Sequence, residues 1–356
     1  MKKIICILMV LVLAVGSMLA LSGCGKSYDG EINVFNWGEN ISDGTDDSMD
    51  VIKEFEDKFN IKVNYTTYET NEELYSILSS SNSSYDIVIP SDYMIEKLIS
   101  EDLLTEINFE NVPNYKNIAE TYKNLPFDPD NKYSVPYTWG VVALGYNKAM
   151  VNGVEIKGFA DLWNENLKGN ILMIDNSRDA MAIAMQLSGI TPTKFTKADV
   201  DKAAEKLSQQ KPLLKKYVMD MVFTEMEGAQ AAIAPYYAGD IYSMIQNNPD
   251  LTYCLREEGS NFFVDSMCIP KSTQNKEGAE LFINFMLEAE VGAANAEYIG
   301  YSTPNSEAFK LLPEEIQNSE LIYPSEEYLK KCYSFADLDK EVYAYMQEKF
   351  IEVKAE

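Results

Sequence analysis

The sequence predicts an α/β fold built as two lobes. Short apolar strands alternate with amphipathic helices from Gly30 onward, a pattern typical of sheets covered by helices. Residues 133–146 form a long extended stretch that contains Pro136 and Gly140, and such an interrupted strand suits a crossing between lobes. A second strand and helix pattern follows it. A chain of 356 residues has about the length of two typical domains, so each lobe can form its own hydrophobic core.

The chain opens with a βαβαβ pattern, the start of a mostly parallel sheet with helices on both faces. Residues 32–36, 61–65 and 85–90 are short apolar or alternating runs that predict strands. Apolar residues recur at helical spacing between 49 and 59. Asn71 is the predicted N-cap of the helix that precedes the third strand.

The rest of the chain continues the alternation. Strands are predicted at 171–174, 231–234, 251–255 and 262–270, and helices at 180–187 and 197–210. From residue 276 to the C-terminus the pattern is mainly helical. Asp265 lies inside the apolar run 262–270, where a lone acid is costly unless it is paired or placed at a cleft.

The charge balance favours a cationic partner. Thirty Lys and Arg residues stand against 56 Asp and Glu residues, which gives a formal net charge of −26. This charge repels nucleic-acid phosphates and anionic lipid headgroups, so we expect no nucleic-acid partner. Acidic surfaces also aid solubility, so net charge alone does not identify a ligand.

The absence of histidine removes many catalytic and metal sites. No His-ligated zinc, Ser-His-Asp triad or histidine general base is available to this chain. The sequence also has no GxGxxG or GxxxxGK[ST] run and no CxxC pair. We therefore expect no cofactor and no metal. An enzyme that uses two carboxylates stays open.

The N-terminus predicts export and a lipid anchor. Lys2 and Lys3 precede an apolar run, so residues 1–23 are predicted to be a signal peptide. The run ends in Leu21-Ser22-Gly23-Cys24, which resembles the lipobox of bacterial lipoproteins, whose cysteine is acylated. We expect Cys24 to carry lipid, residues 24–28 to form the anchor linker, and the protein to lie on the outer face of the cell membrane. The alternative is an uncleaved transmembrane anchor.

The end of the first strand predicts a recognition site. Trp37, Gly38 and Glu39 follow the apolar run 32–36, and ligands of open α/β sheets bind outside the carboxyl ends of strands. A tryptophan face and a carboxylate together suit a cation. The alternative is that Trp37 belongs to the core and Glu39 to a solvated turn.

Several segments together resemble the substrate-binding proteins of bacterial polyamine ABC importers, the spermidine/putrescine-binding family. The resemblance runs in order over nearly the whole mature chain. The segments that carry it are Phe35-Asn36-Trp37 and residues 68–72, 85–91, 126–129, 133–140, 161–163, 265–270, 275–279 and 299–305.

The resemblance implies a two-lobed periplasmic-binding-protein fold of type II, with the ligand in the cleft between two mostly parallel sheets. One lobe would comprise residues 29–144 and 263–309, and the other residues 145–262 and 310–356. It also implies a monomer that performs no catalysis and delivers a polyamine to the membrane permease of an ABC importer.

The family binds the ammonium groups of its ligand with acids and surrounds the methylene groups with aromatic rings. Carried over to matching positions, the implied ligand-binding residues are Trp37, Glu39, Ser91, Tyr93, Asn176, Asp179, Tyr236, Phe263, Asp265 and Tyr301. Each has a structural alternative. Asp179 is equally suited to cap the helix that begins there, and Tyr236, Phe263 and Tyr301 are equally suited to packing.

The chain departs from the family pattern at several of these positions. Asn176 stands where the family commonly has a second acid, and Tyr236 and Phe263 stand where tryptophans are usual. Gly38 and Asn40 replace a hydroxyl residue and a tyrosine. A glutamine usual near the C-terminal end of the site has no counterpart around Phe335. These differences leave the preferred amine open.

Other function classes stay open on the sequence alone. One is a solute-binding lipoprotein for another small cationic or polar solute. A second is an exported carboxylate-dependent hydrolase, and a third is a structural lipoprotein without a small ligand.

Overall fold

The computed structural model describes residues 28–80 and 83–355. The predicted signal peptide of residues 1–23 and the lipidation residue Cys24 lie outside this part. Within residues 28–80 and 83–355, no helix combines the length and the apolar character that crossing a membrane requires.

The strands are joined side by side through one mixed sheet in the order β2-β1-β3-β9-β4-β7-β5-β6, with β8 beside β4. Their bounds are β1 Gly30–Trp37, β2 Ile61–Tyr68, β3 Ile87–Val88, β4 Ser134–Asn147, β5 Ile171–Ile174, β6 Leu214–Val218, β7 Ile233–Tyr237, β8 Leu251–Cys254 and β9 Phe262–Cys268.

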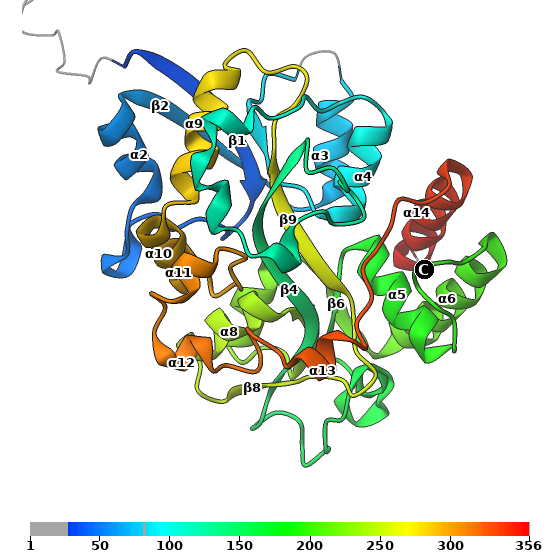
Figure 1. Cartoon of the computed structure of the whole chain (residues 1–356). Coiled ribbons are helices and arrows are strands. Elements are labelled where there is room, and N and C mark those ends of the chain that lie inside the picture. The colour runs from blue at the N-terminus through cyan, green and yellow to red at the C-terminus, as the bar shows by residue number, and fades with distance from the viewer. Residues whose placement is uncertain (1–27, 81–82, 356) are drawn as a thin grey trace, which may run out of the picture.

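The helices cover the two ends of this sheet (Figure 1). Their bounds are α2 Val51–Phe59, α3 Asn71–Leu78, α4 Asp92–Ser100, α5 Ser177–Leu187, α6 Lys197–Gln210, α7 Met221–Glu227, α8 Ala238–Asn247, α9 Lys276–Met286, α10 Ala289–Ile299, α11 Ser306–Phe309, α12 Glu314–Gln317, α13 Glu326–Leu329 and α14 Lys340–Ala355.

The outer strands of the sheet are parallel and its centre is antiparallel. β1 pairs in parallel with β2 and β3, and β5 with β6 and β7, as the βαβ pattern predicts. In the centre, β4 pairs antiparallel with β7, β8 and β9, and β3 pairs antiparallel with β9. The expectation of mostly parallel strands therefore holds at the two flanks, while returning strands occupy the middle.

β4 is the long crossing that the sequence predicts. Its first half pairs with β9 and its second half with β7 and β8, so this central strand links the β1 side of the sheet to the β5 side (Figure 1). Gly140 lies where β4 meets β9, and a Cβ at this position would lie 2.8 Å from Cζ of Phe263. The missing side chain of Gly140 leaves room for that ring beside the strand.

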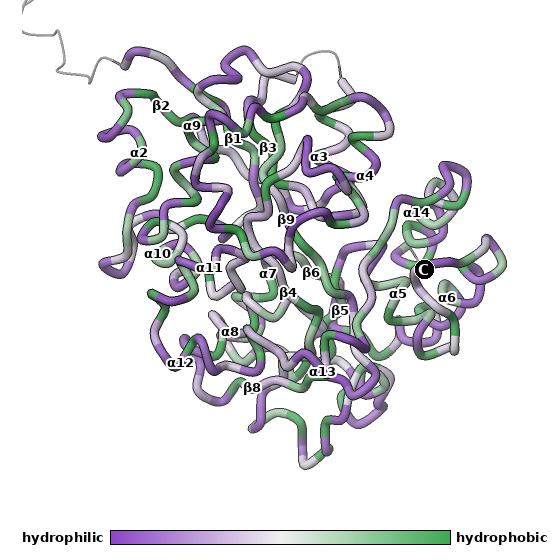
Figure 2. The backbone as a smooth tube through the Cα atoms, in the orientation of Figure 1, coloured by the Kyte–Doolittle hydropathy of each residue, from purple (hydrophilic) through white to green (hydrophobic). Residues whose placement is uncertain are grey.

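Separate hydrophobic cores lie at the two ends of the sheet. One packs the β1 side, where the rings of Phe55 and Phe282 meet with centroids 5.0 Å apart. The other packs β5, α5 and α6 together with Phe350 of α14. Apolar residues follow the strands through the interior, while the outer helices carry many hydrophilic residues (Figure 2).

Two local predictions were wrong. Thr70, and not Asn71, caps α3, because the Thr70 hydroxyl accepts a bond from the Glu73 amide. The strand predicted at 85–90 is reduced to β3, since only Ile87 and Val88 pair with a neighbouring strand.

Candidate functional site

A cavity of ≈ 620 Å³, including its opening to solvent, lies between the two ends of the sheet. Its walls come from the end of β1, the start of α4 and β9 on one side, and from α5, β7 and α8 on the other. Among the residues predicted from the sequence, the following line it: Trp37, Ser91, Tyr93, Asn176, Asp179, Tyr236, Phe263, Asp265 and Tyr301.

Asp265 is a buried carboxylate held by two hydroxyl groups. The Ser91 hydroxyl donates to Oδ1 over 2.7 Å and the Thr138 hydroxyl to Oδ2 over 3.3 Å. The side chain of Asn71, which does not cap α3, donates to the Ser91 hydroxyl over 3.2 Å. Burial raises the pKa of Asp265 to about 7. The position of this acid inside an apolar strand is thus explained by its place in the cavity wall.

Asp179 forms a second buried carboxylate site on the opposite wall. The Tyr237 hydroxyl donates to its Oδ2 over 3.1 Å, and Nδ2 of Asn261 donates to its Oδ1 over 3.2 Å. Burial raises the pKa of Asp179 to about 6. Oδ1 of Asn261 is buried and has no hydrogen-bond partner among the described residues. A donor on a bound ligand would satisfy this oxygen.

Asn176, and not Asp179, caps α5. Oδ1 of Asn176 accepts bonds from the amides of Arg178 and Asp179 over 2.9 and 3.3 Å. Asp179 therefore keeps its carboxylate for Tyr237 and Asn261. The cap role weighed for Asp179 belongs to the residue three positions earlier.

Asp240 is a third cavity carboxylate, and the sequence reasoning missed it. It lies in the first turn of α8 and is 8% exposed, and the Tyr301 hydroxyl donates to its Oδ2 over 2.9 Å. Burial raises the pKa of Asp240 to about 8. Its signal was available, because Asp240 follows the carboxyl end of β7 by three residues, where ligand groups are expected.

Aromatic rings surround the space between these acids. Trp37 packs on Tyr68 with ring centroids 4.6 Å apart, and its indole nitrogen is buried without a partner among the described residues. On the other side, the Phe263 ring lies 5.3 Å from Tyr237 and 6.4 Å from Tyr301. Such faces attract cations and bury alkyl chains.

The structure does not bring Glu39 into the cavity. Glu39 has a φ of 50°, in the left-handed region, and its side chain is exposed. It lines a neighbouring pocket, which we call the outer pocket, together with Asp46, Asp220, Glu227, Asp240 and Glu297 among others. Asn40 turns inward instead, and its Nδ2 donates to Oδ1 of Asn36 over 3.3 Å.

The cavity wall is acidic and lacks a cationic side chain. Among the described residues, no Lys or Arg lines either the cavity or the outer pocket. The further acids of the cavity are Glu69, Asp92 and Asp220. The nearby Arg178 lies behind the wall, where its guanidinium stacks 4.7 Å from the Tyr93 ring and 4.5 Å from the Phe335 ring.

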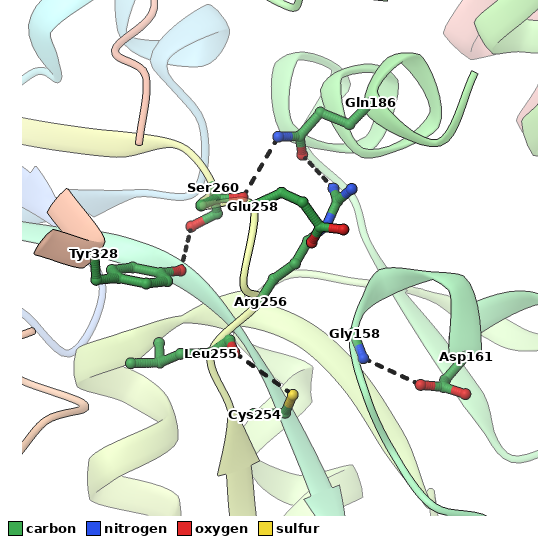
Figure 3. Close-up of polar contacts among 10 residues, drawn as sticks. Gly158, Asp161, Gln186, Cys254, Leu255, Arg256, Glu258, Ser260 and Tyr328 are labelled. Carbon is green, nitrogen blue, oxygen red and sulfur yellow. Dashed lines mark hydrogen bonds and ion pairs between the residues drawn. The ribbon is translucent and has the colours of Figure 1, made fainter. Parts of the chain in front are cut away.

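The segment that carries Asn261 is fixed by polar contacts (Figure 3). Nε of Arg256 donates to Glu258 over 2.8 Å, and Nη1 donates to Oε1 of Gln186 at the end of α5 over 3.0 Å. The Ser260 and Tyr328 hydroxyls lie 3.4 Å apart, and a dashed line marks this contact in Figure 3. These contacts hold the approach to β9 against α5, so Asn261 stays beside Asp179.

The arrangement suits binding of an organic cation. Within residues 28–80 and 83–355, no group of three or more Cys, Asp or Glu side chains is placed to hold a metal ion. Separate acids at the two walls, with aromatic rings between them, match a ligand that has positive groups and an alkyl chain. A two-lobed α/β fold with such a cavity is typical of solute-binding proteins.

Comparisons with known proteins identify the family. Residues 50–323 match the family model described as bacterial extracellular solute-binding protein, and the chain belongs to this family. A spermidine/putrescine-binding periplasmic protein of Salmonella typhimurium is 32% identical over 321 residues, which is 90% of each chain. The putrescine-binding periplasmic protein SpuD of Pseudomonas aeruginosa is 28% identical and covers 94% of this chain and 95% of its own.

Solved structures confirm the fold. A chain from Listeria monocytogenes has a TM-score of 0.87 at 36% identity and covers 91% of this chain and 98% of its own. The spermidine/putrescine ABC transporter substrate-binding protein PotD of Streptococcus pneumoniae has a TM-score of 0.76 at 32% identity. It covers 92% of this chain and 99% of its own.

Proposed function

We propose that this protein captures a polyamine of the putrescine and spermidine class outside the cell membrane and delivers it to the permease of an ABC importer. The relatives named for spermidine and putrescine support the ligand class. We further propose that the protein acts as a monomer, without catalysis, and is held at the membrane by lipid on Cys24.

One observation carries the proposal. Asp179, Asp240 and Asp265 line a single cavity with aromatic rings, and no Lys or Arg of the described residues lines that cavity. Arg178 behind the wall partly compensates Asp179, but no cation in the described part of the chain compensates Asp240 or Asp265, and such buried carboxylates are unfavourable in the empty protein. An alkylammonium ligand supplies the missing positive charge and N–H donors, while its methylene groups pack on Trp37 and Phe263.

The proposed mechanism is closure of two lobes around the amine. We assign residues 29–144 and 263–309 to one lobe and residues 145–262 and 310–356 to the other. The separate hydrophobic cores support this division. Because Asp265 lies on one wall and Asp179 on the other, an amine that contacts both acids favours the closed state.

Calorimetry with putrescine and spermidine tests the proposal. We expect binding in the micromolar range, about 8 kcal/mol, for at least one of the two amines. The control ligand is 1,4-butanediol, which has the length of putrescine without its charges, and we expect no measurable heat from it. Absence of heat and of thermal stabilisation with both amines at millimolar concentration would refute the polyamine assignment.

A further inference from the structure

Gly38 and Asp220 face each other across the mouth of the cavity. Gly38 follows β1, and Asp220 immediately precedes α7 on the opposite wall. A Cβ built at Gly38 would overlap Oδ2 of Asp220 and lie 3.3 Å from its Cγ. Gly38 does not have a positive φ, so an alanine there is compatible with the backbone. The absent side chain therefore leaves space that the Asp220 carboxylate occupies.

The Asp220 carboxylate does not cap the helix that follows it. Asp220 is the N-cap residue of α7, but its side chain accepts no capping bond from that helix. Aspartate is preferred at N-caps because it usually accepts such a bond. In this chain the carboxylate is directed toward Gly38 instead.

Asp220 also lies where the cavity meets the outer pocket. Asp220 and Asp240 line both spaces, whereas Asp179 and Asp265 line only the cavity. Partial burial, followed by repulsion from Glu69 and Glu39, raises the pKa of Asp220 to about 6. At neutral pH this acid is mainly ionised among acidic neighbours, so a bound cation would relieve the repulsion.

We infer that Asp220 binds the ammonium group at the outer end of the amine, and that Gly38 is the residue that permits this contact. The inference rests on the proposed function and adds a specificity determinant to it. Asp265 and Asp179 line only the cavity and are available to the inner part of the ligand, whereas Asp220 lies at the outer end. The site therefore selects linear amines that carry a positive charge at both ends.

Charge-specific variants of Asp220 test the inference by calorimetry with putrescine. Asp220→Asn keeps the shape and removes the charge, and we expect affinity to fall about tenfold. Asp220→Glu keeps the charge, and we expect affinity within about threefold of the unmodified protein. The matched control is Asp250→Asn, an exposed acid that lines neither pocket. We expect this control to bind putrescine normally and all three variants to keep their melting temperature.

A double-mutant cycle tests the role of Gly38. Gly38→Ala should push the Asp220 carboxylate away and weaken putrescine binding about tenfold in the unmodified protein. In an Asp220→Ala background the added methyl group meets no carboxylate, so Gly38→Ala should change affinity by less than about twofold.

These experiments distinguish failure of the proposed polyamine binding from failure of the roles assigned to Asp220 and Gly38. If the unmodified protein binds neither putrescine nor spermidine, the proposed function fails. If it binds putrescine but Asp220→Asn binds equally well, or Asp220→Glu binds as weakly as Asp220→Asn, the assignment of Asp220 is overturned. Equal losses from Gly38→Ala in the two backgrounds overturn the role of Gly38.

Discussion

At the scale of single residues, Asp265 has the arrangement expected of a ligand-binding acid. Its two oxygens are held by Ser91 and Thr138, but neither neighbour brings a positive charge. The hydroxyl groups fix the position of the carboxylate without neutralising it. A ligand ammonium is then the partner that compensates its burial.

Asp265→Asn should separate binding from stability. The substitution removes a charge with little change of shape, and we expect amine binding to weaken by roughly 2–5 kcal/mol. The melting temperature of the ligand-free protein should not fall, because the ionised form of this acid is disfavoured by burial. Calorimetry and a thermal melt measure the two quantities. If binding is unchanged and the melting temperature drops, Asp265 is a structural residue.

Most residues that line the cavity could be predicted from their types and positions in the sequence. For two acids, Glu39 and Asp240, the prediction differed from the structure. Glu39 was expected in the site, and its left-handed φ turns its side chain to the outer pocket instead. Asp240 was not expected, because the sequence pattern did not reveal that α8 begins directly after β7. A one-residue change in backbone conformation is not encoded in charge or periodicity, so only the fold places Glu39, whereas Asp240 could have been found from its position three residues after the end of β7.

At the scale of secondary structure, Asn176 links a helix terminus to the cavity. It accepts two amide hydrogen bonds at the start of α5, which carries Asp179 one turn later. The resemblance to polyamine-binding proteins implies an acid at this position, and an aspartate would cap equally well. The cap therefore explains why the chain tolerates an amide at this position.

Asn176→Ala should mainly affect stability. Loss of the two capping bonds should lower the free energy of unfolding by about 1 kcal/mol. Asn176→Asp is the matched control, since it preserves the cap and should keep that free energy within a few tenths of a kcal/mol. Urea unfolding of the two variants measures the difference. Equal destabilisation by Ala and Asp would show that the cap is not the stabilising feature.

Periodicity predicted several elements with nearly correct bounds and missed three helices near the cavity. Residues 171–174 and 197–210 are β5 and α6 with the predicted bounds, and the crossing at 133–146 is β4 within one residue at each end. α4, α7 and α8 were missed, because each begins directly beside a strand end or a loop rich in cavity residues. In those stretches polar cavity residues such as Ser91, Asp92 and Asp240 interrupt the apolar spacing.

At the scale of the whole molecule, β4 and β9 connect the two ends of the sheet. The cavity acids come from both of these ends. Asp265 lies on β9, and Asp179 and Asp240 lie on α5 and α8. No Lys or Arg of the described residues lines the cavity, so the proposed closure would bring like charges together in the empty molecule. In the proposed mechanism, the ligand charge is what favours the closed arrangement.

Protonation of the buried cavity carboxyl groups should make both protein stability and amine binding depend on pH. Burial raises the pKa of Asp179, Asp265 and Asp240 to about 6, 7 and 8. In the unfolded chain an aspartate has a pKa of about 3.9, so between about pH 4 and pH 8 the folded protein binds more protons than the unfolded one. These three groups thus make the ligand-free protein less stable as pH rises through that window.

Putrescine should reverse this trend. Its ammonium groups bind the ionised carboxylates, so affinity should strengthen between about pH 5 and pH 8, where the amine stays protonated. Melting temperatures measured with and without putrescine across this range should show a stabilisation that grows with pH. Asp265→Asn is the control and should flatten the rise, because it removes the group with a pKa of about 7. A stabilisation that is constant or shrinks from pH 5 to pH 8 would mean that the buried carboxyl groups do not bind the amine in their ionised form.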